Sequence, residues 1–196
     1  MIRRPPPAIL VLAAGASSRM RGVDKLLEPV DGMPLLLRAA RAALRAAPDV
    51  IVGLPAGNRI HRAWLADLPV RVVEVAERAM SATVRAGVAA CRSDALLLHL
   101  ADMPEIEADD LSAVVTAWQA SDAAILRATA ADGTPGHPVC FARSLFPALA
   151  ALRGDDGARA VLRGRDVMRV PLPGRRALLD LDTPEAWIEW REATGR

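Results

Sequence analysis

The chain has few cysteines, few aromatic residues and a single lysine. The first two shortages each exclude a class of protein. Two cysteines in 196 residues cannot form a disulfide framework and suit a reducing compartment, so we expect a cytoplasmic protein. Aromatic residues make up 3% of the chain, too few for the stacking surfaces that hold single-stranded nucleic acid. No apolar run approaches the roughly 18 residues of a membrane-spanning helix. We therefore expect neither a nucleic-acid partner nor a membrane.

The chain also lacks a strong charge of one sign. Its 25 basic and 23 acidic residues are interspersed and leave a net charge of +2. The most concentrated basic stripe, Arg38, Arg41 and Arg45, lies at helical spacing opposite an apolar face. We interpret it as the solvated side of a helix, which again argues against nucleic-acid binding.

Short apolar runs alternate with longer amphipathic segments through most of the chain. Several runs are apolar at consecutive positions, as strands covered on both faces are. The pattern predicts one three-layer α/β domain, residues 1–196, with a mainly parallel central sheet. The predicted strands are 8–13, 50–54, 70–75, 95–101 and 123–128, and the predicted helices are 34–47, 59–66, 81–91 and 108–120.

The last third of the chain is less regular. Thr183 is placed to cap a final helix, and Pro184 suits its first position. The pattern predicts strands at 138–141, 166–170 and 176–181, and helices at 144–152, 157–162 and 184–193.

The single lysine, Lys25, closely follows the segment VLAAGASSRM, in which an apolar strand gives way to small residues. Gly15 can turn where other residues strain, and successive backbone N–H groups can then converge on an anion. Ser17 and Ser18 add hydroxyl donors, while Arg19 and Lys25 add positive charge. The spacing matches neither the P-loop nor the dinucleotide fingerprint, and a plain small-residue turn is the alternative. The assembly suits a polyphosphate.

Two carboxylates follow other predicted strands. Asp102 ends the apolar run at 95–101, with Pro104 preventing continuation, and Asp182 lies between a predicted strand and the last helix. Open α/β sheets build their sites at such junctions, and Mg²⁺ shares oxygen ligands with phosphates. Taken alone, an aspartate before Met-Pro is more often a turn residue than a metal ligand.

Six motifs occur in the order found in one enzyme family: LAAGASSRM…DKLL, MSATVRAG, LADMP, GHPVCF, GDDGARAVL and LDLDTPE. In this respect the chain resembles the MobA-like nucleotidyltransferases, and most of all the molybdenum cofactor cytidylyltransferases. The resemblance runs from residue 9 to about residue 187. It implies a Rossmann-like nucleotidyltransferase fold of the GT-A type. Two positions depart from the family pattern, since Arg21 and Ala79 stand where a glycine is usual.

The resemblance also implies roles for individual residues. Arg19, Lys25 and Asp102 match catalytic positions, Asp102 and Asp182 match the residues that hold Mg²⁺, and His137 matches a segment near the acceptor. The implied nucleotide-binding residues are Leu12, Ala13, Ala14, Gly15, Ala16, Ser17, Ser18, Arg19, Lys25, Ser81 and Thr83.

The implied reaction transfers CMP from CTP to the phosphate of molybdopterin or molybdenum cofactor and releases pyrophosphate. Ala14 occupies a position where guanylyl-transferring relatives tend to carry glycine, so the resemblance favours CTP over GTP. The alternatives are guanylyl transfer and cytidylyl transfer to a sugar or polyol phosphate. A further alternative is a non-catalytic carrier of molybdenum cofactor, and in either role a molybdoenzyme could receive the product.

The remaining polar residues of interest have structural interpretations. Three scattered histidines and two cysteines lack metal-ligand spacing, so we expect no zinc site. We expect His99 and Cys140 to be core residues, with His99 hydrogen-bonded, and His61 to lie on a helix surface.

Overall fold

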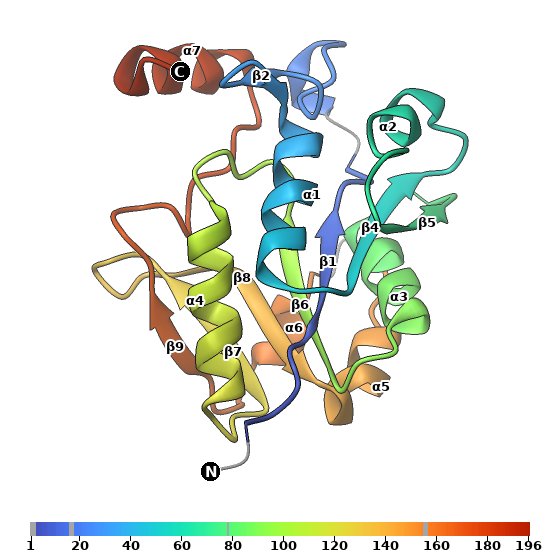
Figure 1. Ribbon diagram of the computed structural model, residues 1–196, viewed down its shortest axis with the longest axis vertical. Coiled ribbons are helices and arrows are strands. Elements are labelled where there is room, and N and C mark those ends of the chain that lie inside the picture. The colour runs from blue at the N-terminus through green and yellow to red at the C-terminus, as the bar shows by residue number, and fades with distance from the viewer. Residues whose placement is uncertain (1–2, 16–17, 78, 155–156) are drawn as a thin grey trace.

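The structure is a computed structural model that describes residues 3–15, 18–77, 79–154 and 157–196. Its centre is a seven-stranded sheet of order β5-β4-β1-β6-β8-β7-β9 (Figure 1). β8 runs antiparallel to both of its neighbours and all other pairs are parallel, which confirms the mainly parallel α/β sheet. The strands are β1 (Ala8–Leu12), β4 (Val50–Pro55), β5 (Arg71–Val75), β6 (Ala95–Leu100), β7 (Ile125–Thr129), β8 (Pro135–Ala142) and β9 (Met168–Pro171), and a separate hairpin pairs β2 (Pro29–Val30) with β3 (Met33–Pro34).

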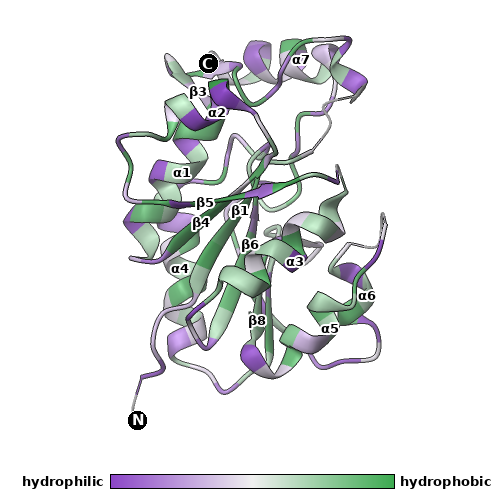
Figure 2. Cartoon of the chain, turned by 90° about the vertical axis from the view of Figure 1, so that its right-hand side faces the viewer, coloured by the Kyte–Doolittle hydropathy of each residue, from purple (hydrophilic) through white to green (hydrophobic). Residues whose placement is uncertain are grey.

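Helices cover both faces of the sheet and make three layers, as Figure 2 shows edge-on. Along β1, Ile9 and Val11 pack into the core beneath α1 and α4, while Ala8 and Leu10 pack into the core beneath α3 and α5. This alternation explains why the strand is apolar at consecutive positions. The helices are α1 (Leu35–Ala46), α2 (Arg59–Trp64), α3 (Met80–Ala90), α4 (Ala108–Gln119), α5 (Phe146–Ala150), α6 (Arg159–Leu162) and α7 (Pro184–Thr194).

The last helix, α7, packs on the β2–β3 hairpin at the top of Figure 1. The Thr183 hydroxyl accepts a hydrogen bond from the Ala186 amide at 3.2 Å, which confirms the expected cap. Both tryptophans of the helix are buried, and the Trp190 indole donates to Glu105 at 3.1 Å. A small core forms from Met20, Val30, Leu35, Leu181, Trp187 and Trp190.

The prediction of a strand at 176–181 is wrong. This segment forms turns, with the Leu178 amide donating to the Arg175 carbonyl at 2.9 Å. Its other backbone groups bond to β8 and to Asp102, so no neighbouring strand pairs with it. The short β2–β3 hairpin was not predicted, because two-residue strands carry no periodicity. No helix in the described part of the chain is long and apolar enough to cross a bilayer.

Candidate active site

A pocket of about 240 Å³ lies at the carboxyl ends of β1 and β6. Leu12, Ala14 and Gly15 of the first loop line it, and Ala13 is buried beside them. Gly15 does not adopt a left-handed backbone, and an added Cβ would meet no described atom within 4 Å. The absence of side chains therefore keeps this wall open, rather than relieving strain at Gly15. The predicted contacts of Ala16 and Ser17 lie outside the described residues, and Ser18 begins a 3-10 helix, Ser18–Met20.

A left-handed turn carries the chain from this loop to Lys25. Arg21 and Gly22 have φ values of 51° and 93°, which are costly for arginine and free for glycine. The usual glycine would thus sit comfortably at position 21, and Arg21 instead pairs with Glu185 at 2.7 Å. The departure at this position keeps the turn and adds a contact to α7.

The residue before Lys25 is fixed by a buried histidine. His61, 3% exposed on α2, lies with Nε2 2.7 Å from a carboxylate oxygen of Asp24. The other Asp24 oxygen accepts from the Leu26 amide at 3.1 Å, and contact with His61 is the main cause that lowers the pKa of Asp24. The expectation that His61 lies on the surface is therefore wrong. Asn58 caps α2 by accepting from the His61 amide, so the backbone of His61 is fixed in the first turn of the helix.

Lys25 is itself buried between two carboxylates. Its Nζ lies 2.5 Å from Asp102 and 2.7 Å from Asp182, and Arg19 contacts the second oxygen of Asp182 at 2.5 Å. The four predicted residues Arg19, Lys25, Asp102 and Asp182 thus meet in one cluster lining the pocket. They come from positions as far apart as 19 and 182, so the fold and not local sequence brings them together.

A third carboxylate, Asp180, belongs to this cluster and was not predicted. Oxygen atoms of Asp102, Asp180 and Asp182 lie within 4.8 Å of one another. The signal was present in the motif LDLDTPE, where two aspartates lie two positions apart and would share one face of a strand, but only Asp182 was assigned a role. Both side chains line the pocket.

The acidic segment docks through backbone contacts. The Leu181 amide donates to the Asp102 carbonyl at 3.2 Å, and the His137 amide donates to the Ala177 carbonyl at 2.8 Å. At Gly136, an added Cβ would lie 1.9 Å from the Ala177 carbonyl oxygen, so only glycine permits this approach. The first residues of β8 therefore help to set the position of the segment that carries Asp180 and Asp182.

The charges in the cluster reinforce one another. Burial alone would lower the pKa of Lys25, but Asp102 and Asp182 outweigh it and raise that pKa. Burial opposes ionisation of Asp182, yet Lys25 and Arg19 lower its pKa overall. Partial burial, followed by repulsion from Asp182 and Asp102, raises the pKa of Asp180. A cation added beside Asp180 would relieve that repulsion.

The donor set fits a hard divalent cation. Three carboxylates converge, and oxygen is the ligand that Mg²⁺ and Mn²⁺ prefer. Lys25 contacts two of these carboxylates. A metal ion and the lysine therefore compete for the same negative charge.

Of the two predicted nucleotide-binding residues on α3, one lines the pocket and the other stabilises the position of the helix. Thr83 lines the pocket, and its methyl group packs where Gly53 lacks a side chain. Ser81 is fully buried and donates to the Gly154 carbonyl at 2.6 Å, which ties α3 to that loop. The structure therefore does not bring Ser81 to the pocket lining, and a direct contact with the nucleotide base stays a prediction.

His137 lies in a second, larger pocket of about 490 Å³. Met80, Leu100 and Asp180 line both pockets, so the two adjoin. Burial, then the charge of Arg127, lowers the pKa of His137 to about 4, so this side chain is neutral near pH 7. The position suits the acceptor segment that the motif GHPVCF implied.

The core predictions for two other residues have different outcomes. Cys140 is completely buried, as expected. His99 is also completely buried, but neither ring nitrogen has a hydrogen-bond partner among the described residues. The expected hydrogen bond is therefore not found. Burial, then repulsion from His137, lowers the pKa of His99 to about 3 and keeps it neutral.

Residues 9–170 match the model of one protein family, the MobA-like NTP transferase domain. The chain belongs to this family. The MobA-like match ends before the acidic segment, so Asp180 and Asp182 lie outside the matched residues.

Several proteins are similar to this MobA-like chain over most of their length. The molybdenum cofactor cytidylyltransferase of Escherichia coli is 27% identical, over 93% of this chain and 94% of that protein. A molybdenum cofactor guanylyltransferase of Burkholderia ambifaria is 33% identical, over 82% of this chain and 80% of that protein. The purine catabolism protein PucB of Bacillus subtilis is 27% identical, over 97% of this chain and 98% of that protein.

Solved structures also resemble it. The Rv0371c protein of Mycobacterium tuberculosis has a TM-score of 0.81 and 31% identity, covering 95% of this chain and 98% of that one. The same protein has been solved in complex with manganese, with a TM-score of 0.81 and 29% identity, covering 96% of this chain and 100% of that one. The MobA-like chain is thus a nucleotidyltransferase of Rossmann-like fold.

Proposed function

We propose that this nucleotidyltransferase transfers CMP from CTP to the phosphate of molybdopterin or molybdenum cofactor, with Mg²⁺ as its metal. The observation that carries the proposal is the cluster of Lys25 with Asp102, Asp180 and Asp182 beside the small-residue loop. It combines a cation for the phosphates of a nucleotide with three oxygen donors for a metal.

The chain's own groups support an in-line transfer. An oxygen of the acceptor phosphate forms a bond to the α-phosphorus of CTP, and the bond from that phosphorus to the bridging oxygen breaks. Pyrophosphate leaves with the electron pair, and Arg19 and Lys25 neutralise its growing charge. A divalent metal held by Asp102, Asp180 and Asp182 would supply charge neutralisation at the phosphates when bound. Most of the catalysis is then positioning and charge stabilisation.

The ion pairs of Lys25 are expected to couple the binding of metal to the binding of nucleotide. Lys25 occupies two of the metal's carboxylates, so metal alone meets a site whose charge is already neutralised. The triphosphate offers Lys25 a different anion and frees Asp102 and Asp182. Metal and nucleotide are therefore expected to bind together more tightly than either alone.

Support for CTP comes from Ala14 and from the similarity to the Escherichia coli cytidylyltransferase. The similarity to the Burkholderia guanylyltransferase keeps GTP as a second candidate. Mn²⁺ is the second candidate metal, since a similar protein has been solved with manganese. A carrier role for molybdenum cofactor would require neither Lys25 nor Asp102.

The test is pyrophosphate release by the purified protein with Mg²⁺ and molybdopterin, comparing CTP, GTP, ATP and UTP. Asp102→Asn is expected to abolish release, because it removes a metal donor, whereas Asp109→Asn on the exposed start of α4 is the matched control. Pyrophosphate release with CTP alone supports the proposal. Release with GTP alone would show that GTP and not CTP is the nucleotide donor. Unimpaired molybdoenzyme maturation by Asp102→Asn would instead support the carrier role.

A further inference from the structure

The second pocket carries positive charge without the carboxylates that balance it in the first. Arg127 of β7, Arg159 of α6 and Arg163 line it, and among the described lining residues the one acidic side chain is Asp180, which belongs to the aspartate cluster of the first pocket. No ion pair joins these three arginines to a carboxylate within residues 3–15, 18–77, 79–154 and 157–196. Elsewhere in the described chain, ten arginines from Arg19 to Arg196 do pair with carboxylates.

Arg127 is held in place by the backbone. Its Nε donates to the Gly136 carbonyl at 2.9 Å and one terminal nitrogen donates to the Pro135 carbonyl at 3.2 Å. Partial burial, followed by repulsion from Arg159 and Arg169, lowers the pKa of Arg127. The guanidinium is thus oriented before any ligand binds. A bound anion would offset both the burial of its charge and the repulsion from the other arginines.

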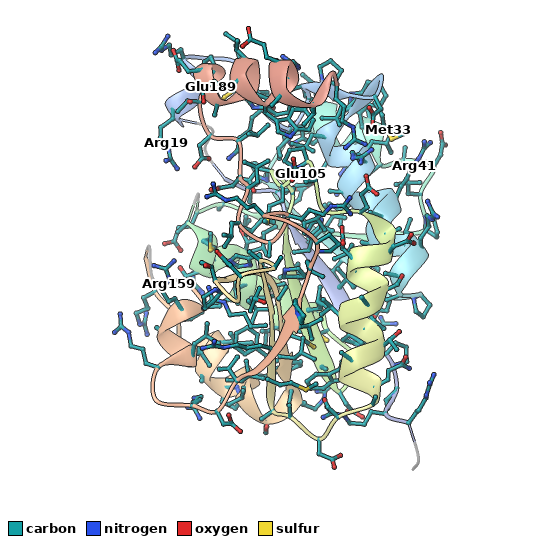
Figure 3. The ribbon with its side chains drawn as sticks, turned by 90° about the vertical axis from the view of Figure 1, so that its left-hand side faces the viewer. Arg19, Met33, Arg41, Glu105, Arg159 and Glu189 are labelled. Carbon is teal, nitrogen blue, oxygen red and sulfur yellow. The ribbon has the colours of Figure 1, made fainter. Side chains whose placement is uncertain are left out.

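The neighbouring groups favour an anion rather than a cation. His137 lines the same pocket in its neutral form, so it adds no charge of its own at pH 7. Arg159 and Arg163 are exposed, one on α6 and one directly after it. Figure 3 shows Arg159 on the same side of the molecule as Arg19 of the first pocket, and lower in that view. The two pockets also share Met80, Leu100 and Asp180, so one ligand can occupy both.

We propose that the second pocket binds a second anionic group of the acceptor, at Arg127 and Arg159, while the reacting phosphate lies beside the aspartates. The acceptor is therefore a phosphomonoester with another anionic group at its far end, such as a carboxylate, a phosphate or a metal oxyanion. This inference rests on the proposed transfer to an acceptor phosphate. It adds the requirement that the acceptor carry charge at both ends.

The test uses alkanediol bisphosphates of three chain lengths and the matching alkyl monophosphates as probes. Their binding is measured by calorimetry with Mg²⁺ and a non-hydrolysable CTP analogue, and again without nucleotide. Because an ionic hydrogen bond adds roughly a tenfold gain or more, the best bisphosphate is expected to bind at least about tenfold more tightly than its monophosphate.

The variants assign that advantage to the pocket. Arg159→Met is expected to remove most of it, and since Arg159 is exposed, the variant should fold. Arg127→Met is expected to act likewise. Arg169→Met is the matched control, because Arg169 is close enough to affect Arg127 but does not line the pocket. An equal affinity for bisphosphate and monophosphate, or an equal loss in Arg169→Met and Arg159→Met, would overturn the inference.

The outcomes separate this inference from the proposed function. If the CTP analogue fails to bind, the proposed donor is wrong, and the titration without nucleotide still measures the arginine site. If the analogue binds and the bisphosphates show no advantage, the donor stands and the second anion site is wrong.

Discussion

The two adjoining pockets manage charge in opposite ways. In the first, Lys25 and Arg19 are paired with aspartates at 2.5 to 2.7 Å, so the cluster is neutralised from within. In the second, Arg127 is fixed by carbonyls and repelled by other arginines. On the proposed function, the first pocket would exchange its ion-pair partners when metal and nucleotide bind, whereas the second already presents a fixed positive charge. The proposed nucleotide side would thus rearrange on binding, and the proposed acceptor side would recognise an anion without rearrangement.

The sharpest test of this contrast is Lys25→Met. Loss of one phosphate-neutralising group is expected to lower the transfer rate about 100- to 1,000-fold. The same change frees Asp102 and Asp182, so Mn²⁺ alone should bind about tenfold more tightly, as measured by calorimetry without nucleotide. Arg21→Met, on an exposed arginine paired with Glu185, is the control. Weaker metal binding in Lys25→Met would show that the lysine supports the metal site and does not compete with it.

Replacement of the buried, neutral His99 tests how its burial makes the stability of the protein depend on pH. The folded-state pKa of His99 is lowered to about 3, so the unfolded chain binds the extra proton as pH falls below about 6.5. Stability from a neutral His99 is complete above that pH and is lost on acidification. His99→Leu should remove about 2 to 3 kcal/mol of the stability change between pH 7 and pH 4.5, measured by urea unfolding. Identical pH profiles in both proteins would contradict this account.

A smaller effect is expected where the pockets share a wall. Gly136→Ala would place a Cβ against the Ala177 carbonyl and should cost about 1 to 3 kcal/mol of unfolding free energy. The displaced segment carries Asp180 and Asp182, so metal-dependent thermal stabilisation should fall as well. Gly157→Ala is the matched control, because its Cβ would meet Met80 at an ordinary 3.5 Å. Equal stabilisation of both variants by Mn²⁺ would exclude the wall as the support of the metal site.

The smallest effect should come from the contact behind Lys25. In His61→Gln the shorter side chain is expected to lose the contact with Asp24, which fixes the residue before Lys25. The loss should raise the activation free energy of transfer by about 1 kcal/mol, measured as a few-fold lower transfer rate. Binding of the acceptor probes should be unchanged, because His61 does not line the second pocket. A change in probe affinity would show that the pockets are coupled through α2.

Much of the fold could be predicted from the sequence because buried parallel strands are apolar at consecutive positions. β1, β4, β5 and β6 were predicted to within two residues at each end. The segment 176–181 has a similar apolar content, but its backbone makes one bond to His137 of β8, one to Asp102 and others within turns, rather than a strand ladder. Such docking depends on Gly136, more than 40 residues away, and no local pattern reveals it.

In the candidate site, too, residues marked by a local sequence pattern could be predicted, and residues that depend on distant contacts could not. Arg19, Lys25, Asp102 and Asp182 follow strands or begin helices, so their positions could be predicted from the topology. Asp180 was missed because the acidic role of the motif LDLDTPE was assigned to Asp182 alone, although aspartates two positions apart share a face of a strand. His61 was placed on the surface because its contact with Asp24 joins α2 to the segment before Lys25 and leaves no periodic signal.

The division of the metal donors along the chain has a consequence for synthesis. Asp102 lies within the 9–170 family match, whereas Asp180 and Asp182 follow it and are fixed by the docking of α7. A chain still emerging from the ribosome can assemble its sheet from the amino-terminal side first. It lacks two of the three proposed metal ligands until residues 180–182 have been made. The proposed cation site therefore forms only after the strands that position Asp102.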